Sequence, residues 1–145
     1  MTNLEALRAY VSSGGPPTGW HITLGARLTE VDAGRVVVEL DAGPDHLHEW
    51  GLVQGGIITS IADAAMGLSV LTVQPEGEVN LTAELKINFL RGVRSGRTRA
   101  VGTVIRADPH LLFSSAEVFD AQGRLVAMAT STLLPVPGGI PGAAL

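Results

Sequence analysis

Residues His48–Val73, HEWGLVQGGIITSIADAAMGLSVLTV, are the stretch around which the chain is organised. The stretch opens as a loop, crosses the pair Gly55 and Gly56, and continues as the only long apolar run in the sequence. Apolar residues occur nearly all round a helix drawn through this run, which is typical of a buried helix. Asp63 lies within it, and a carboxylate on a buried helix is costly unless it is paired or functional. We therefore expect a buried central helix that carries one functional acid.

Size and composition limit the classes of protein that this chain can form. Its 145 residues predict a single domain, with a core at about 20–135 and an irregular tail at 136–145. The absence of cysteine excludes disulfides, thiolate metal sites and a cysteine nucleophile, and it fits a cytoplasmic location. The net charge of −4 argues against nucleic-acid binding, which needs a basic surface.

Neither the long apolar run nor the N-terminus indicates a membrane protein. The run from Leu52 to Val73 reaches the roughly 20 residues that a bilayer requires. However, it contains Asp63 and Gln54, and no lysine or arginine closely flanks it. Residues 1–13 lack the pattern of a signal peptide and predict a short amphipathic helix. We therefore expect no membrane-spanning segment.

The sequence predicts β-strands both before and after the central helix. Alternation from His21 onward, with a turn at Asp32–Gly34, predicts a β-hairpin before it. Four further strands are predicted after it, at 79–89, 97–106, 111–120 and 125–134. In the first of these, alternating apolar and polar residues predict one buried and one polar face. Short turns favour antiparallel neighbours, and the helix is hidden only if the sheet curls around it. We predict an α+β domain, with a second copy pairing along the sheet edge.

Six residues of the central stretch have a characteristic spacing: His48, Gly51, Gln54, Gly55, Gly56 and Asp63. The spacing resembles the signature N-x-x-G-x-x-H-G-G, followed by a helical carboxylate, of hotdog-fold thioesterases of the PaaI-like acyl-CoA type. The resemblance covers about residues 20–135. It implies the hotdog fold, a homodimer or a tetramer of two dimers, and active sites shared between subunits. His48 stands where the family usually has asparagine, and Gln54 where it usually has histidine.

The resemblance implies that the Gly55 amide polarises a thioester carbonyl and that Asp63 is the general base or the nucleophile. The free N–H groups at a helix start are suited to stabilising developing negative charge. Each residue also has a non-catalytic interpretation. The glycines could simply allow close packing, and Asp63 could be satisfied by Thr59 or by a backbone amide.

The histidines receive different assignments. By the family spacing His48 is expected to position water or the carbonyl, and its titration would make activity pH-sensitive. We expect His21, His46 and His110 to be structural. The sequence shows no metal-ligand spacing, so no metal site is predicted. No cofactor is expected either, because coenzyme A would be part of the substrate.

Further residues are expected to bind the substrate. Arginines crowd the turn after the first late strand, where they could bind the phosphates of coenzyme A or simply be solvated. Ser114 and Ser115 lie on a strand that completes the site from a partner subunit in this family. The expected binding residues are Gln54, Gly56, Thr59, Gly67, Arg91, Arg94, Ser114 and Ser115.

The predicted function is hydrolysis of an acyl-CoA whose acyl group is small and aromatic or short to medium and aliphatic. One alternative is a hotdog 3-hydroxyacyl thioester dehydratase or hydratase. It ranks lower because such enzymes usually have a proline-glycine element where this chain has Gln54, Gly55 and Gly56. A second alternative is a non-catalytic acyl-CoA-binding module, although the chain has no basic recognition helix for a regulator.

Overall fold

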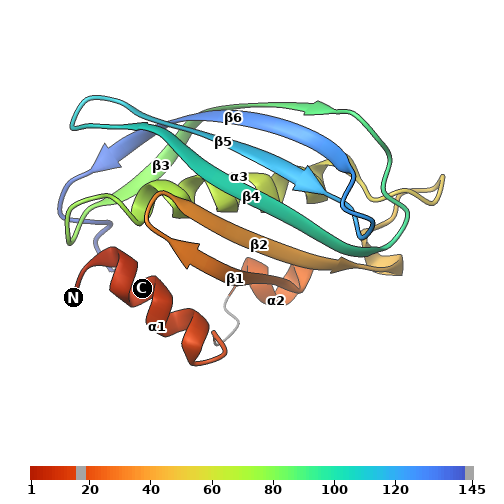
Figure 1. Ribbon diagram of the computed structural model, residues 1–145, viewed down its shortest axis with the longest axis horizontal. Helices are drawn as coiled ribbons and strands as arrows, with labels where there is room; N and C mark the ends of the chain where they lie inside the picture. Colours follow the sequence, from red (N-terminus) through yellow and green to blue (C-terminus); the bar gives the residue numbers. More distant parts are fainter. Residues whose placement is uncertain (16–18, 143–145) are drawn as a thin grey trace.

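The computed structural model describes residues 1–15 and 19–142, which form an antiparallel sheet curled around one long helix (Figure 1). The sheet has six strands in the order β1-β2-β4-β5-β6-β3. The elements are α1 (Asn3–Ser12), α2 (Trp20–Leu24), β1 (Ala26–Asp32), β2 (Arg35–Ala42), the 3-10 turn η1 (Pro44–His46), α3 (Gly55–Leu71), β3 (Val79–Phe89), β4 (Gly96–Ala107), β5 (Leu112–Phe119) and β6 (Leu125–Val136). The predicted α+β class and the curled sheet around a central helix are confirmed.

Helix α3 packs very closely against the middle of the sheet. A Cβ atom placed on Gly102 of β4 would lie 2.1 Å from the carbonyl oxygen of Ala65 and 2.9 Å from the amide nitrogen of Met66. Only glycine allows this approach, and it lets Ile61 and Met66 become fully buried. Within the described part of the chain, no helix is long and apolar enough to span a membrane.

The two edges of the sheet differ in their cover. Helix α1 packs along β1, where Leu7 is buried and the Arg8 Nε donates to the Val31 carbonyl oxygen at 3.3 Å. The outer edge of β3 has no strand beside it among residues 1–15 and 19–142. An uncovered edge presents unpaired N–H and C=O groups, so β3 is the edge on which a second chain could add.

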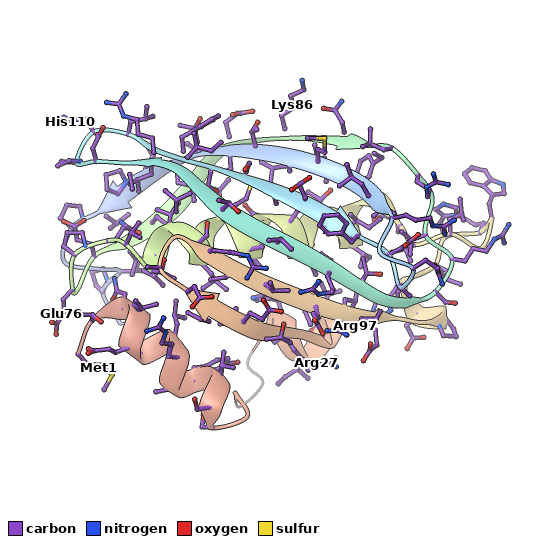
Figure 2. The ribbon with its side chains drawn as sticks, viewed as in Figure 1. Met1, Arg27, Glu76, Lys86, Arg97 and His110 are labelled. Atoms are coloured by element: carbon purple, nitrogen blue, oxygen red, sulfur yellow. The ribbon has the colours of Figure 1, made fainter. Side chains whose placement is uncertain are left out.

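The alternation along β3 changes phase at a β-bulge, and here the sequence prediction of one continuous buried face is wrong. The register against β6 shifts between Thr82 and Glu84. Before the bulge Thr82 lies opposite the buried Leu133, on the side of the sheet that faces α3, although it stays exposed there, and Leu81 is left about half exposed. After the bulge the apolar residues face inward, and Lys86 points away from the sheet (Figure 2).

The segment before β1 also differs from its prediction. Residues 21–24 were expected to begin a strand, but Trp20–Leu24 form the short helix α2 and β1 starts at Ala26. Gly25 ends the helix with a left-handed φ of 73°, and its N–H donates to the His21 carbonyl oxygen at 2.8 Å. Four alternating residues do not distinguish a strand from one turn of helix. The predicted breaker before this segment falls partly on residues 16–18, outside the described residues.

At the carboxyl end, β6 continues through Val136, and the described residues after it form turns and irregular backbone. The irregular tail therefore begins one residue after the predicted start at 136, and residues 143–145 lie outside the described part.

Candidate active site

The candidate site begins at the start of α3. Gln54 caps the helix, and its Oε1 accepts a hydrogen bond from the Gly56 N–H at 2.5 Å. The Gly55 N–H has no acceptor among the described residues. It therefore combines an unused donor with the positive end of the 17-residue helix dipole.

The loop before the helix brings His48 beside this donor. The Trp50 N–H donates to His48 Nδ1 at 3.1 Å, and the two rings meet edge to face with centroids 5.3 Å apart. Because Nδ1 accepts, the neutral imidazole carries its proton on Nε2. Gly51 has a left-handed φ of 75°, which allows the tight turn in this loop.

His48 and Gly55 line two adjoining cavities. The larger, of about 740 Å³, is open and is also lined by Gln54 and Trp50. The smaller, of about 360 Å³, extends toward Phe89 and Arg91. The structure thus brings together His48, Gln54, Gly55 and Arg91 from the residues proposed on sequence.

Asp63 lies in a different cavity, on the side of α3 that faces β3. This cavity has a volume of about 470 Å³, and its lining includes Gly67, Thr82 and the α2 residues Trp20 and His21. Asp63 is half-buried, and its Oδ1 accepts a hydrogen bond from Thr82 Oγ1 at 2.8 Å. The bulge in β3 turns Thr82 inward and so gives the carboxylate this partner.

Gly55 and Asp63 of one chain are too far apart to act on the same carbonyl group. Eight residues separate them along α3, which corresponds to about 12 Å along the helix axis. None of the three cavities described above is lined by both residues. A site that used both would have to combine Gly55 of one chain with Asp63 of another.

The helix residues around Asp63 have mainly local partners. Thr59 Oγ1 donates to the Gly55 carbonyl oxygen at 2.8 Å, so Thr59 is not the partner of Asp63. The Gly67 carbonyl oxygen accepts from Asn80 Nδ2 at 3.0 Å, which ties the helix to β3. Gly67 nevertheless lines the cavity of Asp63.

Ser114 and Ser115 lie apart from these cavities. Ser114 is fully buried on the inner face of β5, opposite Val104 and Ser131, and its Oγ has no hydrogen-bond partner in the described chain. Ser115 alternates to the outer face and is half-buried. Neither lines the cavities of His48, Gly55 or Asp63.

The four arginines of one inter-strand region separate into two pairs. Arg97 and Arg99 project from β4 onto the outer face of the sheet and bond Glu39 of β2. Burial of Glu39 opposes its ionisation, but the hydrogen bonds and charges of the two arginines outweigh this and hold its pKa below the ordinary value. Arg91 lines the smaller cavity, and Arg94 is exposed. Figure 2 shows Arg97 beside β1 and β2.

Sequence reasoning missed Thr82, Trp20 and His21 as residues of the Asp63 cavity. Thr82 was assigned to a solvated face, and the signal that would have placed it is the bulge, which depends on pairing with β6. His21 was expected to be structural, and its α2 position was hidden by the apparent strand pattern. His110 lies at the tip of the β4–β5 hairpin (Figure 2).

The described residues contain no candidate metal site. Across 1–15 and 19–142, no three histidine or carboxylate side chains gather closely enough to hold an ion. The absence of a catalytic metal remains a prediction.

Comparison with known proteins identifies the family. A sequence model of the thioesterase superfamily matches residues 51–127. The protein named "Putative esterase SSO2140" from Saccharolobus solfataricus is 35% identical over 106 residues, covering 73% of this chain and 75% of that protein. The PaaI protein from the phenylacetic acid degradation operon of E. coli has a TM-score of 0.82 at 19% identity, with 94% and 98% of the two chains covered. A phenylacetic acid degradation-related protein from Ralstonia eutropha has a TM-score of 0.76 at 27% identity, with 86% and 96% covered.

The helix wrapped in a curled antiparallel sheet is the hotdog fold, and with the family match it defines a thioester hydrolase. The chain belongs to the thioesterase superfamily. The resemblance seen in the sequence is therefore confirmed.

Proposed function

We propose that this protein is a cytoplasmic acyl-CoA thioesterase that converts a small aromatic or a short to medium aliphatic acyl-CoA into the free acid and CoA. The observation that carries the proposal is the uncommitted Gly55 N–H at the start of α3, open to a cavity beside His48. A backbone donor held at a helix N-terminus stabilises the negative charge that develops on a carbonyl oxygen during acyl transfer.

The reaction uses the remaining groups as follows. The thioester oxygen accepts a hydrogen bond from Gly55, which makes the carbonyl carbon more electrophilic. Asp63 then either takes a proton from an attacking water or attacks the carbon itself to form an anhydride that water hydrolyses. In both routes the carbon–sulfur bond breaks and CoA leaves as the thiolate. The Thr82 hydroxyl fixes the orientation of the Asp63 carboxylate.

The catalytic unit is a homodimer, in which each site takes Gly55 from one chain and Asp63 from the other. The separation of about 12 Å along α3 supports this arrangement, because one chain does not bring both groups to one carbonyl. The uncovered edge of β3 is the surface for a two-fold contact, and two such dimers could form a tetramer. Arg91 and Arg94 bind the CoA phosphates at the mouth of the site.

Mixing two inactive variants tests the shared site. Asp63→Asn removes the base or nucleophile, and Gly55→Pro removes the amide hydrogen. Proline is tolerated at the first position of a helix, and Gln54 before it already has the extended conformation that proline requires, with φ −62° and ψ 133°. Gly55→Ala is the matched control, because it keeps the N–H and adds only a Cβ facing the Phe89 ring.

Each variant alone is expected to lose at least about a hundredfold in kcat. Refolding them together should restore about a quarter of the wild-type activity, because each mixed dimer has one site with both native residues. Release of CoA from a panel of aromatic, aliphatic and 3-hydroxyacyl thioesters is the measurement. No restoration on mixing, with both variants folded and dimeric, would refute the shared site. Binding or dehydration of the thioesters without CoA release by the wild type would refute hydrolysis itself.

A further inference from the structure

The cavity of Asp63 has an aromatic wall that the proposed reaction does not use. Trp20 and His21, both from α2, line it, and Leu68 and Leu71 supply apolar surface from α3. Trp20 keeps 37% of its surface exposed. An indole left partly open beside a catalytic carboxylate is available to contact the bound substrate.

This wall is held in a defined position. Gly25 closes α2 in a left-handed conformation, as described above. His21 Nδ1 lies 3.3 Å from the Ala26 carbonyl oxygen, and since a carbonyl only accepts, the His21 nitrogen donates. The Trp20 and His21 rings are in contact, tilted at 35° to one another, with centroids 4.2 Å apart. The contacts connect the Trp20 ring, through His21, to the first residue of β1.

Polar and apolar groups occupy different parts of the cavity. Asp63 and Thr82 form the polar part through their hydrogen bond. Asn80 also lines the cavity, but its Nδ2 already donates to the Gly67 carbonyl oxygen and to Gln74 Oε1. A thioester whose carbonyl carbon lies at Asp63 would therefore direct its apolar acyl group toward α2 and the leucines of α3.

We propose that Trp20 and His21 form the wall of the acyl-binding pocket and select flat aromatic acyl groups over straight chains. This inference rests on the proposed thioesterase function and specifies its substrate class. An aromatic acyl group gains a ring-stacking contact with the indole that a straight chain does not gain. The volume of about 470 Å³ has room for such a group, because an apolar cavity of ~150 Å³ already accommodates benzene.

Two thioesters matched in carbon number, phenylacetyl-CoA and octanoyl-CoA, test the selectivity. Trp20→Ala should lower kcat/KM for phenylacetyl-CoA by about tenfold or more and for octanoyl-CoA by at most a few fold. Trp20→Phe should keep most of the preference, because it keeps a ring. Ile22→Ala is the matched control: Ile22 lies on the same short helix but is 64% exposed and should leave both substrates unchanged. Equal losses on both substrates, or none, would overturn the proposal.

Intrinsic fluorescence gives a readout that does not need catalysis. The chain has two tryptophans, so the difference between titrations of wild type and Trp20→Phe isolates the Trp20 signal. A non-hydrolysable thioether analogue of phenylacetyl-CoA should change this signal saturably, and the octanoyl analogue should change it less. If the Trp20 fluorescence does not change when the phenylacetyl analogue is added, the proposed role of Trp20 is refuted, even if the enzyme is active. If the Trp20 fluorescence changes saturably but the wild type hydrolyses no thioester, the role of Trp20 in binding is supported and the proposed thioesterase function is refuted.

Discussion

The two sides of α3 are built in opposite ways. On the side against β4, Gly102 touches the helix backbone and no space remains even for a methyl group. On the side toward β3, the helix borders a cavity, and Asp63 is only half-buried. The closed side fixes the position of the helix, and the open side carries the carboxylate that we propose to be catalytic.

The difference shows how a buried helix can present a carboxylate without losing stability. The closed side supplies apolar burial and close packing, which dominate the free energy of folding. The open side contributes little packing, so polar groups such as Asp63 and Thr82 can be placed there. Substitutions on the closed side should therefore change stability, and those on the open side should change activity.

The largest effect is expected for Gly102→Ala on the closed side. The added Cβ would lie 2.1 Å from the Ala65 carbonyl oxygen and 2.3 Å from its carbon, which are backbone atoms of α3 and cannot turn aside. Helix and sheet must separate, and we expect a loss of about 3 kcal/mol or more in the free energy of unfolding, measured by chemical denaturation. Gly43→Ala is the control, because no atom lies within 4 Å of its added Cβ. Similar stability of the two variants would show that the closed side is not closely packed.

A smaller stability effect is expected for Glu39→Gln on β2, the strand next to β4. Arg97 and Arg99 hold the pKa of Glu39 below its ordinary value of 4.5 although burial opposes this. The stabilisation is therefore present above pH 4.5 and is lost as the pH falls through the lowered pKa. Because solvent reaches the arginines, we expect the variant to lose about 1 to 2 kcal/mol at neutral pH.

The measurement is denaturation of both proteins over a pH series, in which the difference in stability should shrink below the ordinary pKa. Glu117→Gln is the control, because Glu117 is exposed and has no ion pair within the described residues. A difference independent of pH would assign the effect of Glu39→Gln to packing.

On the open side, Thr82→Val should reduce activity and leave stability nearly unchanged. Valine keeps the shape of threonine but removes the hydroxyl that donates to Asp63 at 2.8 Å. We expect kcat to fall by about tenfold with little change in KM, because the carboxylate loses its orientation. Thr82→Ser should retain most of the activity. If serine lost as much as valine, Thr82 would act through packing, and the hydrogen bond would not matter for catalysis.

The elements of the fold were predictable from sequence because their signals are local. Alternation and flanking turn residues placed β3 at its observed bounds, and the apolar run placed α3. The prediction was wrong at Trp20–Leu24, where two glycines define a helical turn, and along β3, where the bulge reverses the facing of Thr82. Both features depend on local backbone geometry or strand pairing, which alternation does not encode.

The site was predictable in part for the same reason. His48, Gln54 and Gly55 are neighbours in sequence, so one loop brings them together. Trp20 and Thr82 reach Asp63 only through tertiary packing, and they were missed. The arginines were treated as a single cluster, but cross-strand pairing directs Arg97 and Arg99 to Glu39. Of the other two, Arg91 lines the cavity beside Gly55 and Arg94 is exposed.

This separation of the arginines leads to the smallest predicted effect. Arg91 lines the cavity beside Gly55, so Arg91→Ala should raise KM for an acyl-CoA by about two- to fivefold, through the loss of one exposed charge contact with phosphate. KM for the matching acyl-pantetheine, which lacks the nucleotide, should not change. The effect should also diminish at high salt, because exposed charges are screened. Arg106→Ala is the control, since Arg106 pairs with Asp108 beside the β4–β5 turn. An equal rise in KM for both thioesters would show that Arg91 contacts the acyl or pantetheine part and does not bind the nucleotide.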